Sequence, residues 1–519
     1  MAVVYQVFTP GVYIKELPSG SSPIQGVNTA VAAFLGVTEQ VPDELIGKPV
    51  LVTSWTQYKD TFGNFNGGSL PLPHSVHGYF LNGGGVAYVM SLGAAKAFPP
   101  VEAKRALALP SRAPGGAPTL ELTPKVESSV KVTVEDDGAD AFKIGLESDG
   151  KQESFDGLTF EEKPSGGRKA AVKTLQGSKL VNVKELPSTD AIELRRPAVG
   201  NYEIAAIGVM HAAVPSVKQI QGNLEDRVGL EALEAIPDIT MICMPDIMVW
   251  QKEGRISLED AQGLQLALIN HCHGMFEKSS SPRMAILDAP AGMKPQRVKT
   301  WRKSEANYDS MFAALYYPWI EIQNPAGKGR ISMPPSAYVA GLYARVDGER
   351  GVHKAPANEV LRGAVALEIE ITDAEQGQLN PDGINCIRSF PGRGIRVWGA
   401  RTLSSDMNWN YINVRRLFNY VERSIFNGTQ WVVFEPNDMD LWERVKRTVT
   451  AFLTNVWRSG ALFGATPEQA FYVKCDEELN PQATRDLGML LVEVGLAPVK
   501  PAEFVVFQFK QMKDGDSAA

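Results

Sequence analysis

Helical and strand-like patterns alternate along residues 202–322, and this order constrains the fold more than any other feature of the chain. "GLEALEAIP" has a helical pattern and leads into the apolar run "ITMICMPD". In the same way "DAQGLQLALINHCHGMFEK" leads into "RMAILDAP", and "VKTWRKSEANY" leads into "FAALYYPWIEI". Because strands joined through a helix run in the same direction, this order predicts an α/β domain with parallel strands covered by helices.

The regions before this domain differ from it and from each other. "TAVAAFLGVTE" and "GVAYVMSLG" predict buried strands, and "SWTQYKDTFG" and "LPHSVHGYFLNGGG" predict short helices. From about residue 99 to 200, short runs such as "SVKVTVEDD" alternate apolar and polar residues between turns of Asp, Gly, Ser and Pro. This alternation predicts an inserted all-β domain with one solvated face.

The region from residue 331 predicts an α+β domain. "NVRRLFNYVERSIF" is typical of a helix and "TQWVVFE" of a strand, and "QAFYVKCD", "GMLLVEVGLAP" and "EFVVFQF" predict late strands. The strongest helical pattern runs from Asp438 to Ser459, with Asn437 or Asp438 as its cap and Gly460 at its end. Its apolar face has 3.6-residue spacing and comprises Leu441, Trp442, Val445, Val449, Phe452, Leu453 and Val456.

Both ends of the chain are strand-like and apolar. The N-terminal segment is "MAVVYQVFTPGVYIKELP" and the C-terminal one is "PAEFVVFQFKQMK", and prolines separate each from the rest. One interpretation pairs these strands within their own chain. The other adds them to sheets of neighbouring chains, where main-chain hydrogen bonds provide the strength of the contact. The residues alone leave both interpretations open.

Composition narrows the classes of function. The 519 residues carry a net charge of -7, which argues against a dominant surface for nucleic acid or anionic membrane. No apolar run approaches the roughly 18 residues of a transmembrane helix, and no secretory signal pattern is visible. The four cysteines lie far apart, which favours free thiols in a reducing compartment. We therefore expect the protein to be made and folded in a cytoplasm.

Three motifs suggest chemistry, and none of them is strong. "HCHGMF" places His271 and His273 in a helical pattern where they point in different directions, so packing is the preferred interpretation over a metal site. Asp246 and Asp288 follow apolar strands, where α/β enzymes place functional groups, but no nucleophile motif or phosphate loop accompanies them. "FPGRGIRVWGA" predicts a turn followed by a strand. We expect no catalytic residue, cofactor or metal.

Several segments in the same order resemble the phage tail sheath family, the contractile sheath subunits of phage tails and related injection systems. The likeness is carried by "TPGVYIKELPSGSSPIQGVNTAVAAFLGVTEQ" and "GGGVAYVMSLG", then by "PPSAYVAGLYARVDGERGVHKAPANEVLRGAVAL" and "LNPDGINCIRSFPGRGIRVWGARTL". A last segment runs from "NVRRLFNYVERSIFNG" to "EQAFYVKCD". The likeness covers roughly the first ninety residues and everything after about Tyr202, and leaves out the β insertion.

The resemblance implies a structural protein that polymerises as stacked hexameric rings around an inner tube and contracts. It implies that the terminal strands complete a small sheet in the C-terminal domain of neighbouring subunits. The residues expected in this exchange are Val4, Tyr5, Val7, Phe8, Val12, Tyr13, Phe504, Val505, Val506, Phe507 and Phe509. The side of the 438–459 helix opposite its apolar face is a candidate contact with the inner tube, through Arg444, Arg447 and Arg458.

Further partners implied by the resemblance are baseplate and terminator or cap proteins, with no direct contact to nucleic acid or membrane. Assembly is expected in the cytoplasm, followed by incorporation in a phage tail or an injection particle. Two other classes remain as alternatives: an enzyme on the central domain with Asp246 and Asp288, and an adhesion or receptor-binding module formed by the β insertion.

These expectations divide the chain into six parts. They are an N-terminal arm (1–23), the first part of the core (24–98), the inserted all-β surface domain (99–200), the α/β core (201–330), the inner, tube-facing α+β domain (331–497) and a C-terminal arm (498–519).

Overall fold

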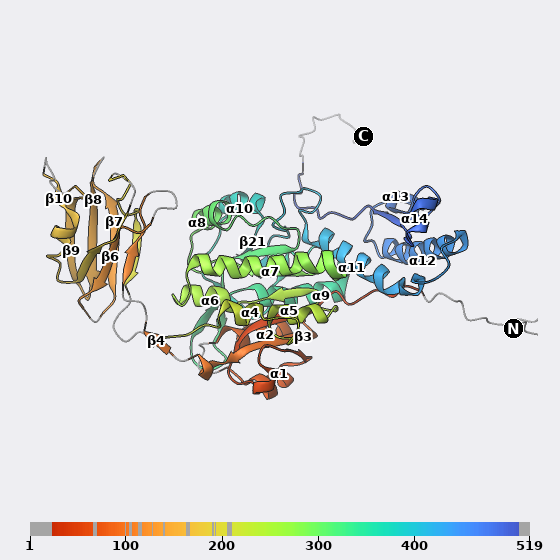
Figure 1. The fold of residues 1–519 in the computed structure, drawn as a ribbon, viewed down its shortest axis with the longest axis horizontal. Coiled ribbons are helices and arrows are strands. Elements are labelled where there is room, and N and C mark those ends of the chain that lie inside the picture. The colour runs from red at the N-terminus through yellow and green to blue at the C-terminus, as the bar shows by residue number, and fades with distance from the viewer. Residues whose placement is uncertain are drawn as a thin grey trace, which may run out of the picture. The chain divides into compact units, whose positions relative to one another are not determined.

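The computed structural model describes residues 23–65, 70–98, 100–102, 106–112, 117–126, 128–138, 141–161, 167–188, 191–192, 194–204 and 210–507. The chain folds as two compact units, both drawn in Figure 1. Unit 1 comprises the described residues within 1–94, 216–249 and 258–519, and unit 2 those within 95–215 and 250–257. The mixed α/β, multidomain architecture expected from the sequence is confirmed.

A nine-stranded sheet organises unit 1. Its strands follow the order β19-β22-β21-β16-β15-β14-β1-β3-β2. Their bounds are β1 (Val31–Thr38), β2 (Pro49–Val52), β3 (Val86–Ala94), β14 (Met241–Cys243), β15 (Met284–Asp288), β16 (Ala313–Tyr317), β19 (Glu359–Val360), β21 (Ile384–Phe390) and β22 (Gly394–Val397).

The central strands of this sheet are parallel, as the helix–strand order predicts. β1 pairs in parallel with β3 and β14, and parallel pairing continues through β15 and β16 to β21. All five residues of β15 are buried, so both of its faces are covered. Cys243 and Ile286 belong to the apolar core shared with helices α2 (Pro71–Leu81) and α9 (Ser336–Arg350). Alternation along the strand turns the buried Leu287 to the other face, where α7 (Leu258–Ser279) contacts β15.

The predicted run "FAALYYPWIEI" does not form one strand. It divides at Pro318 into β16 and β17 (Ile320–Gln323). Proline has no backbone N–H for a ladder, so a central strand of a sheet ends before it. β17 then pairs antiparallel with β18 (Arg330–Met333) and β20 (Ala364–Leu367) in a separate three-stranded sheet.

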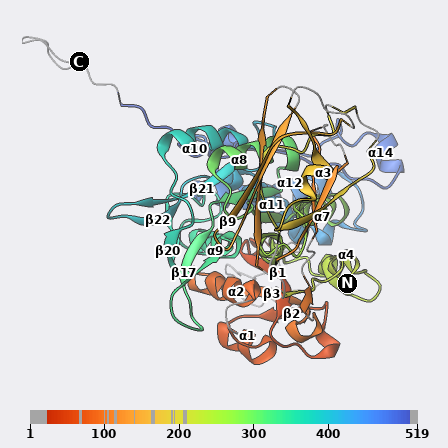
Figure 2. The same cartoon turned by 90° about the vertical axis from the view of Figure 1, so that its left-hand side faces the viewer.

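Short helices connect these strands. In chain order they are η1 (Asp43–Leu45), α1 (Trp55–Phe62), α4 (Val217–Gln221), α5 (Gly229–Ala232), η3 (Leu233–Ala235), α6 (Asp246–Lys252), α8 (Pro295–Thr300), η4 (Trp301–Ala306), α10 (Asp373–Leu379) and η5 (Asn380–Asp382). The predicted turn before the strand of "FPGRGIRVWGA" is confirmed, because β21 and β22 form an antiparallel hairpin through it. Figure 2 shows this hairpin projecting from unit 1.

The C-terminal lobe of unit 1 has its own apolar core. It is built on α11 (Ile412–Gly428) and α12 (Met439–Arg458), with α13 (Pro467–Ala470), α14 (Gln482–Asp486) and the two-stranded sheet of β23 (Phe471–Lys474) and β24 (Glu493–Leu496). The predicted strand "TQWVVFE" is wrong: Gln430–Val432 form the 3-10 turn η6, directly after α11. Its β-branched and aromatic residues suit a strand, but no strand lies beside them in the described residues, and Phe434 has a left-handed backbone (φ 66°).

Unit 2 is dominated by strands around one apolar core. One sheet has the order β10-β9-β8-β7-β12, a second β11-β6-β5, and a third pairs β13 with β4. β7 alternates buried and exposed residues, as its sequence pattern requires. A short helix, α3 (Ala171–Leu175), also belongs to this unit. The strand bounds are β4 (Pro100–Glu102), β5 (Leu107–Leu109), β6 (Leu120–Pro124), β7 (Val130–Asp136), β8 (Phe142–Ser148), β9 (Lys151–Thr159), β10 (Lys169–Ala170), β11 (Val181–Glu185), β12 (Gly200–Ile204) and β13 (Met210–Ala212).

Candidate functional site

Helix α12 forms where its sequence pattern places it. Asp438 is the cap, because its carboxylate accepts a hydrogen bond from the backbone N–H of Leu441 (2.9 Å). The helix ends before Gly460, whose φ of 81° suits a residue without a side chain. The buried residues of α12 are the seven predicted for its apolar face: Leu441, Trp442, Val445, Val449, Phe452, Leu453 and Val456. The spacing of its apolar residues therefore determines where the helix lies in the sequence and which of its sides faces the core.

The three arginines proposed from the sequence on the opposite face of α12 differ in their surroundings. Arg447 and Arg458 are exposed. Arg444 is half-buried: its guanidinium lies 4.6 Å from the ring centre of Trp431 and 3.3 Å from the carboxylate of Glu435. Arg447 and Arg458 are thus available to a partner, whereas Arg444 is engaged within its own chain.

The loop before α12 and the first residue of the helix expose apolar side chains that the sequence reasoning missed. Val433, Phe434 and Met439 are 60%, 103% and 65% exposed. A left-handed backbone is unusual for a bulky residue such as Phe434, and backbone strain of this kind concentrates at functional sites. The sequence indicates this exposed surface only through the apolar run "WVVF", which predicts a strand.

The C-terminal arm is fastened to unit 1 through Glu503, which we call the Glu503 clamp together with Asn380, Arg401 and Tyr411. Arg401 donates to both carboxylate oxygens, from Nε (3.0 Å) and from Nη2 (2.7 Å). The Tyr411 hydroxyl donates to Oε2 (2.9 Å) and the Asn380 side-chain amide to Oε1 (2.5 Å). Burial by itself raises the pKa of Glu503, but the hydrogen bonds from Arg401, Asn380 and Tyr411 outweigh it and hold that pKa below its ordinary value. The clamp was not foreseen from the sequence.

The C-terminal residues predicted for strand exchange follow the clamp directly. Phe504, Val505, Val506 and Phe507 are between 67% and 80% exposed, and residues 501–507 form no strand within the described chain. Among the described residues, the sheet of the C-terminal lobe consists of β23 and β24. Phe509 and the N-terminal candidates Val4, Tyr5, Val7, Phe8, Val12 and Tyr13 lie outside the described residues.

Asp288 and Asp246 hold elements of the fold together. Asp288 ends β15, and its carboxylate accepts from the backbone N–H (2.8 Å) and the hydroxyl (2.6 Å) of Ser336, at the start of α9. Burial raises the pKa of Asp288 to about 7, although these two hydrogen bonds lower it.

Asp246 does not end a strand. It begins α6, and its carboxylate accepts a hydrogen bond from the N–H of Val37 (2.8 Å). A Cβ on Gly36 would lie 2.6 Å from that carboxylate, so glycine is required there.

The "HCHGMF" motif is built into the packing of α7. The Nε2 atom of His271 lies 2.8 Å from the guanidinium of Arg283, and burial together with that charge lowers the pKa of His271 to about 3. Cys272 is buried, which raises the pKa of its thiol to about 12. Among the described residues, no three His, Cys, Asp or Glu side chains are placed to hold a metal ion.

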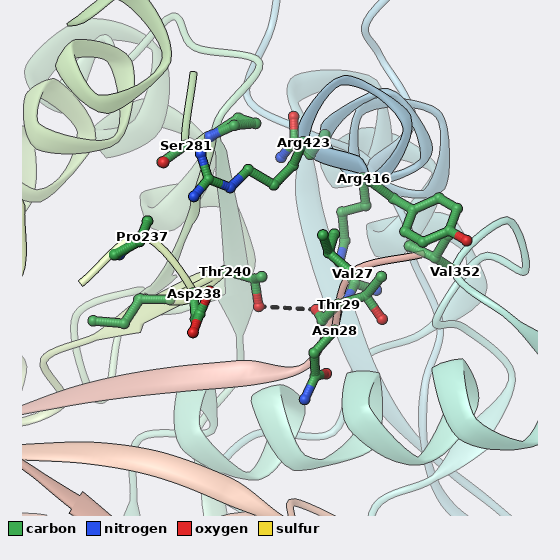
Figure 3. Close-up of a pocket in the computed structure, with 14 residues that line it drawn as sticks. Val27, Asn28, Thr29, Pro237, Asp238, Thr240, Ser281, Val352, Arg416 and Arg423 are labelled. Atoms are coloured by element: carbon green, nitrogen blue, oxygen red, sulfur yellow. Dashed lines mark hydrogen bonds between the residues drawn. The ribbon is translucent and has the colours of Figure 1, made fainter. Parts of the chain in front are cut away.

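Hollows in unit 1 offer little room or chemistry for a substrate. The cavity in Figure 3 has a volume of about 50 Å³ and lies between the segment before β1, the loops at 237–240 and 281–282, and α11. Ligand sites usually enclose several hundred Å³. A wider groove of about 540 Å³ beside Gln25 and Trp431 has no titratable side chain in its lining. Among the described helices, none is long and apolar enough to cross a lipid bilayer.

Comparison with known proteins identifies the fold. The profile of the phage tail sheath protein central domain matches residues 231–403, and that of the phage tail sheath C-terminal domain matches residues 404–512. Together the two matches cover more than half of the chain. The chain belongs to the phage tail sheath family. The sheath family is structural, so the central-domain enzyme that the sequence left as an alternative is set aside.

Relatives support the same assignment for this sheath protein. It is 26% identical to a prophage major tail sheath protein of Pseudomonas aeruginosa, over 60% of this chain and 77% of the relative. It is 28% identical to the tail sheath protein of Burkholderia phage BcepMu, over 43% of this chain and 49% of the relative. Among solved structures, the helical sheath of the anti-feeding prophage in its contracted state matches with a TM-score of 0.59 and 26% identity, covering 97% of this chain and 99% of the other.

A second solved structure extends this comparison. The contracted sheath complex of an extracellular contractile injection system, PVC, matches with a TM-score of 0.56 and 25% identity, over 98% and 99% of the two chains. The sheath protein described above is therefore a structural subunit of a contractile tail or injection machine.

Proposed function

We propose that this sheath subunit polymerises as stacked hexameric rings around an inner tube and contracts to drive that tube through a target envelope. Family membership and the likeness to helical sheaths in the contracted state support the proposal. Free energy for contraction comes from new interface burial between subunits rather than from nucleotide hydrolysis. A repeated heterologous contact, with different surfaces on its two sides, is what an open helical polymer requires.

Exchanged terminal strands join the subunits of this proposed polymer. The observation that carries this step is the exposed apolar segment 504–507, which follows the Glu503 clamp. An exposed apolar strand is a liability for a monomer and a joint for an assembly. Backbone hydrogen bonds to a neighbouring sheet would hold the segment and set its register. The N-terminal segment, with Val4 to Tyr13, is proposed to supply a second joint.

Helix α12 is the proposed contact with the inner tube. Arg447 and Arg458 point almost the same way from the helix, because eleven residues make close to three full turns, and both are exposed. On a protein of net charge -7, these two cations favour an acidic partner surface. Arg444 contributes less, because Glu435 already neutralises it.

Other contacts of the particle follow from the same proposal. Subunits at the two ends meet baseplate and terminator proteins, and none contacts nucleic acid or membrane directly. Assembly takes place in the bacterial cytoplasm, before the sheath becomes part of a phage tail or injection particle. The β insertion, with the boundaries 99–200, lies on the outer surface of the assembly as a decoration.

Negative-stain electron microscopy of the full-length protein beside a variant lacking residues 1–17 tests the proposal. The full-length chain is expected to form hollow, ridged cylinders, and the shortened chain to stay folded without forming them. Circular dichroism of both chains supplies the control for folding. If the shortened chain forms cylinders, the N-terminal segment is not needed to join the subunits. Discrete particles from both chains would contradict polymerisation itself.

A further inference from the structure

The chain leaves the C-terminal lobe and attaches to the central sheet within a few residues. After β24, Ala497 and Val499 still pair with the lobe: the N–H of Ala497 donates to the carbonyl of Ala470 (2.8 Å), and that of Val499 to the carbonyl of Ala461 (3.2 Å). Four residues later Glu503 is held by Arg401, which follows the β21–β22 hairpin. The arm therefore starts from a fixed point outside the lobe.

The Glu503 clamp is a strong joint for a partly exposed site. Its Arg401–Glu503 pair is bidentate and charge-assisted, and the two side chains are only 15% and 18% exposed. The pair is supported from both sides. Asn385 accepts from the backbone N–H of Arg401 (2.7 Å), and the Tyr411 ring lies 6.0 Å from the guanidinium. Holding Glu503 in place fixes the direction in which residue 504 leaves.

The arm leaves unit 1 beside α10. Asn380, one residue after the end of α10, belongs to the clamp. Figure 2 shows the C-terminal segment leaving unit 1 beside α10, on the side opposite α14. In that view the arm points away from the helix that precedes β24 in its own chain.

In the described chain the β23–β24 sheet has two strands, and a single bridge between Leu462 and Pro498 follows β24. A two-stranded sheet is marginally stable in water, and three or more strands are usually needed. Large apolar side chains also remain exposed around it. They are Phe463 (75%), Tyr472 (53%), Leu487 (73%), Met489 (44%), Leu491 (46%) and Val492 (36%). An apolar strand from elsewhere would cover this surface and extend the sheet.

We infer that the Glu503 clamp commits the C-terminal strand to a second copy of this chain. By fixing the arm beside α10, the clamp prevents residues 504–507 from folding back onto their own β23–β24 sheet, and presents them to that sheet in a neighbouring subunit. Glu503 acts as a positioning residue, and the load carried by the exchanged strand enters the sheath core through Arg401. This inference rests on the proposed strand exchange and adds the device that makes the exchange intermolecular.

Assembly of clamp variants gives the first test. Glu503→Ala and Arg401→Ala are expected to raise the concentration needed for tube formation at least tenfold, because the released arm can close on its own lobe. Tyr411→Phe, which removes one of the four hydrogen bonds, is expected to have a smaller effect. Glu477→Ala, at an exposed position outside the clamp, is the matched control. Wild-type assembly by Glu503→Ala would overturn the inference.

Cross-linking distinguishes the two paths of the arm. One chain carries Val505→Cys, and a differently tagged chain carries Tyr472→Cys on β23 or Leu491→Cys before β24. The four native cysteines are buried and do not compete. Oxidation of the mixture is expected to give disulfides between the two tags. With Glu503→Ala added to a chain that carries both substitutions, the disulfide is expected to form within one chain. Intramolecular closure with an intact clamp would overturn the inference.

A variant lacking residues 504–519 separates this inference from the proposed function. Loss of tubes in that variant, together with the clamp effects above, supports both. Normal tubes from it would contradict strand exchange by the C-terminal arm. If the variant lacking residues 504–519 forms no tubes while Glu503→Ala assembles like the wild type, strand exchange is supported and only the role of the Glu503 clamp is contradicted.

Discussion

Buried charged side chains act as joints between the elements of this sheath subunit. Asp347 on α9 accepts two hydrogen bonds from Arg416 on α11 (2.9 and 2.6 Å), and the two side chains are 5% and 4% exposed. Arg416 also donates to the carbonyl of Thr29, just before β1 (3.0 Å). Arg415 pairs with Glu422 and lies 4.4 Å from the ring centre of Trp409. The Asp347–Arg416 pair joins segments that are far apart in the sequence, whereas the Arg415–Glu422 pair lies within α11.

Asp347→Asn is expected to lower the free energy of unfolding by about 3–5 kcal/mol, because it leaves the buried guanidinium of Arg416 without its counter-charge. Urea denaturation of the monomer measures the loss. The control is Glu443→Gln, which breaks the exposed Lys446–Glu443 pair and is expected to cost less than about 1 kcal/mol. Equal effects of the two substitutions would contradict a structural role for the buried pair.

Asp288 predicts a pH dependence of stability with a definite sign. Its pKa is about 7 in the folded protein and about 4 in an unfolded chain. Between these values the folded state binds the extra proton, so the contribution of Asp288 to the free energy of unfolding falls as the pH rises from about 4 to 7. One pKa unit corresponds to about 1.4 kcal/mol, so the loss amounts to a few kcal/mol.

Urea denaturation of the wild type and of Asp288→Asn at several pH values between 4.5 and 7.5 checks this sign. The variant cannot titrate at this position, so the stability of the wild type relative to the variant is expected to fall as the pH rises. Other groups act equally in both proteins: burial raises the pKa of Glu422, which adds a slope of the same sign, and lowers the pKa of His74 to about 4 and of His271 to about 3, which adds slopes of the opposite sign. A slope that is unchanged in the variant would exclude Asp288 as its source.

At the scale of elements, α12 has two sides: an apolar stripe buried in the C-terminal lobe and an exposed face. Apolar spacing places seven side chains in the core, so the helix has one orientation and Arg447 and Arg458 must face outward. The fully exposed Phe434 precedes the helix by a few residues. Exposed cations and a nearby apolar side chain are a combination that suits contact with another protein.

Arg447→Glu combined with Arg458→Glu is expected to weaken assembly on the inner tube while sparing contacts between sheath subunits. The reason is local: the substitutions reverse charge on an exposed face and leave the buried stripe intact. Co-sedimentation of sheath with preformed tubes measures the first contact, and tube-free polymerisation measures the second. Lys131→Glu, on an exposed position of unit 2, serves as a charge-reversal control. Unchanged co-sedimentation would show that these arginines are solvated and do not contact the tube.

At the scale of the whole molecule, the surfaces proposed for assembly all belong to unit 1. The Glu503 clamp, β23, β24 and α12 all belong to unit 1, and unit 2 has an apolar core of its own. A unit with its own core can be removed without opening the core of the other unit. Polymerisation is therefore expected to depend on unit 1.

Replacement of residues 95–215, the larger part of unit 2, by a flexible Gly/Ser linker is expected to leave tube formation intact. Electron microscopy of the shortened chain beside the full-length protein checks the outcome, and circular dichroism confirms that unit 1 is folded. If a folded, shortened chain forms no tubes, the insertion takes part in assembly and is more than a surface decoration.

Local patterns in the sequence determined the elements that depend on near neighbours. Periodicity predicts the parallel strands of the central domain and the seven buried residues of α12. The cap of α12 follows from the hydrogen-bond acceptor that Asp438 places before the helix. The β21–β22 hairpin follows from its turn. These features are encoded within about twenty residues each, so they can be read without knowledge of the rest of the chain.

Only the tertiary structure decided features that join distant residues. The pairing of Glu503 with Arg401 spans about a hundred positions, and nothing in either local sequence indicates it. "TQWVVFE" has the composition of a strand, yet it continues α11 as a turn because no strand lies beside it in the described chain. A strand needs a partner that the local sequence does not contain. The contacts that bring such partners together exist only once the chain is folded.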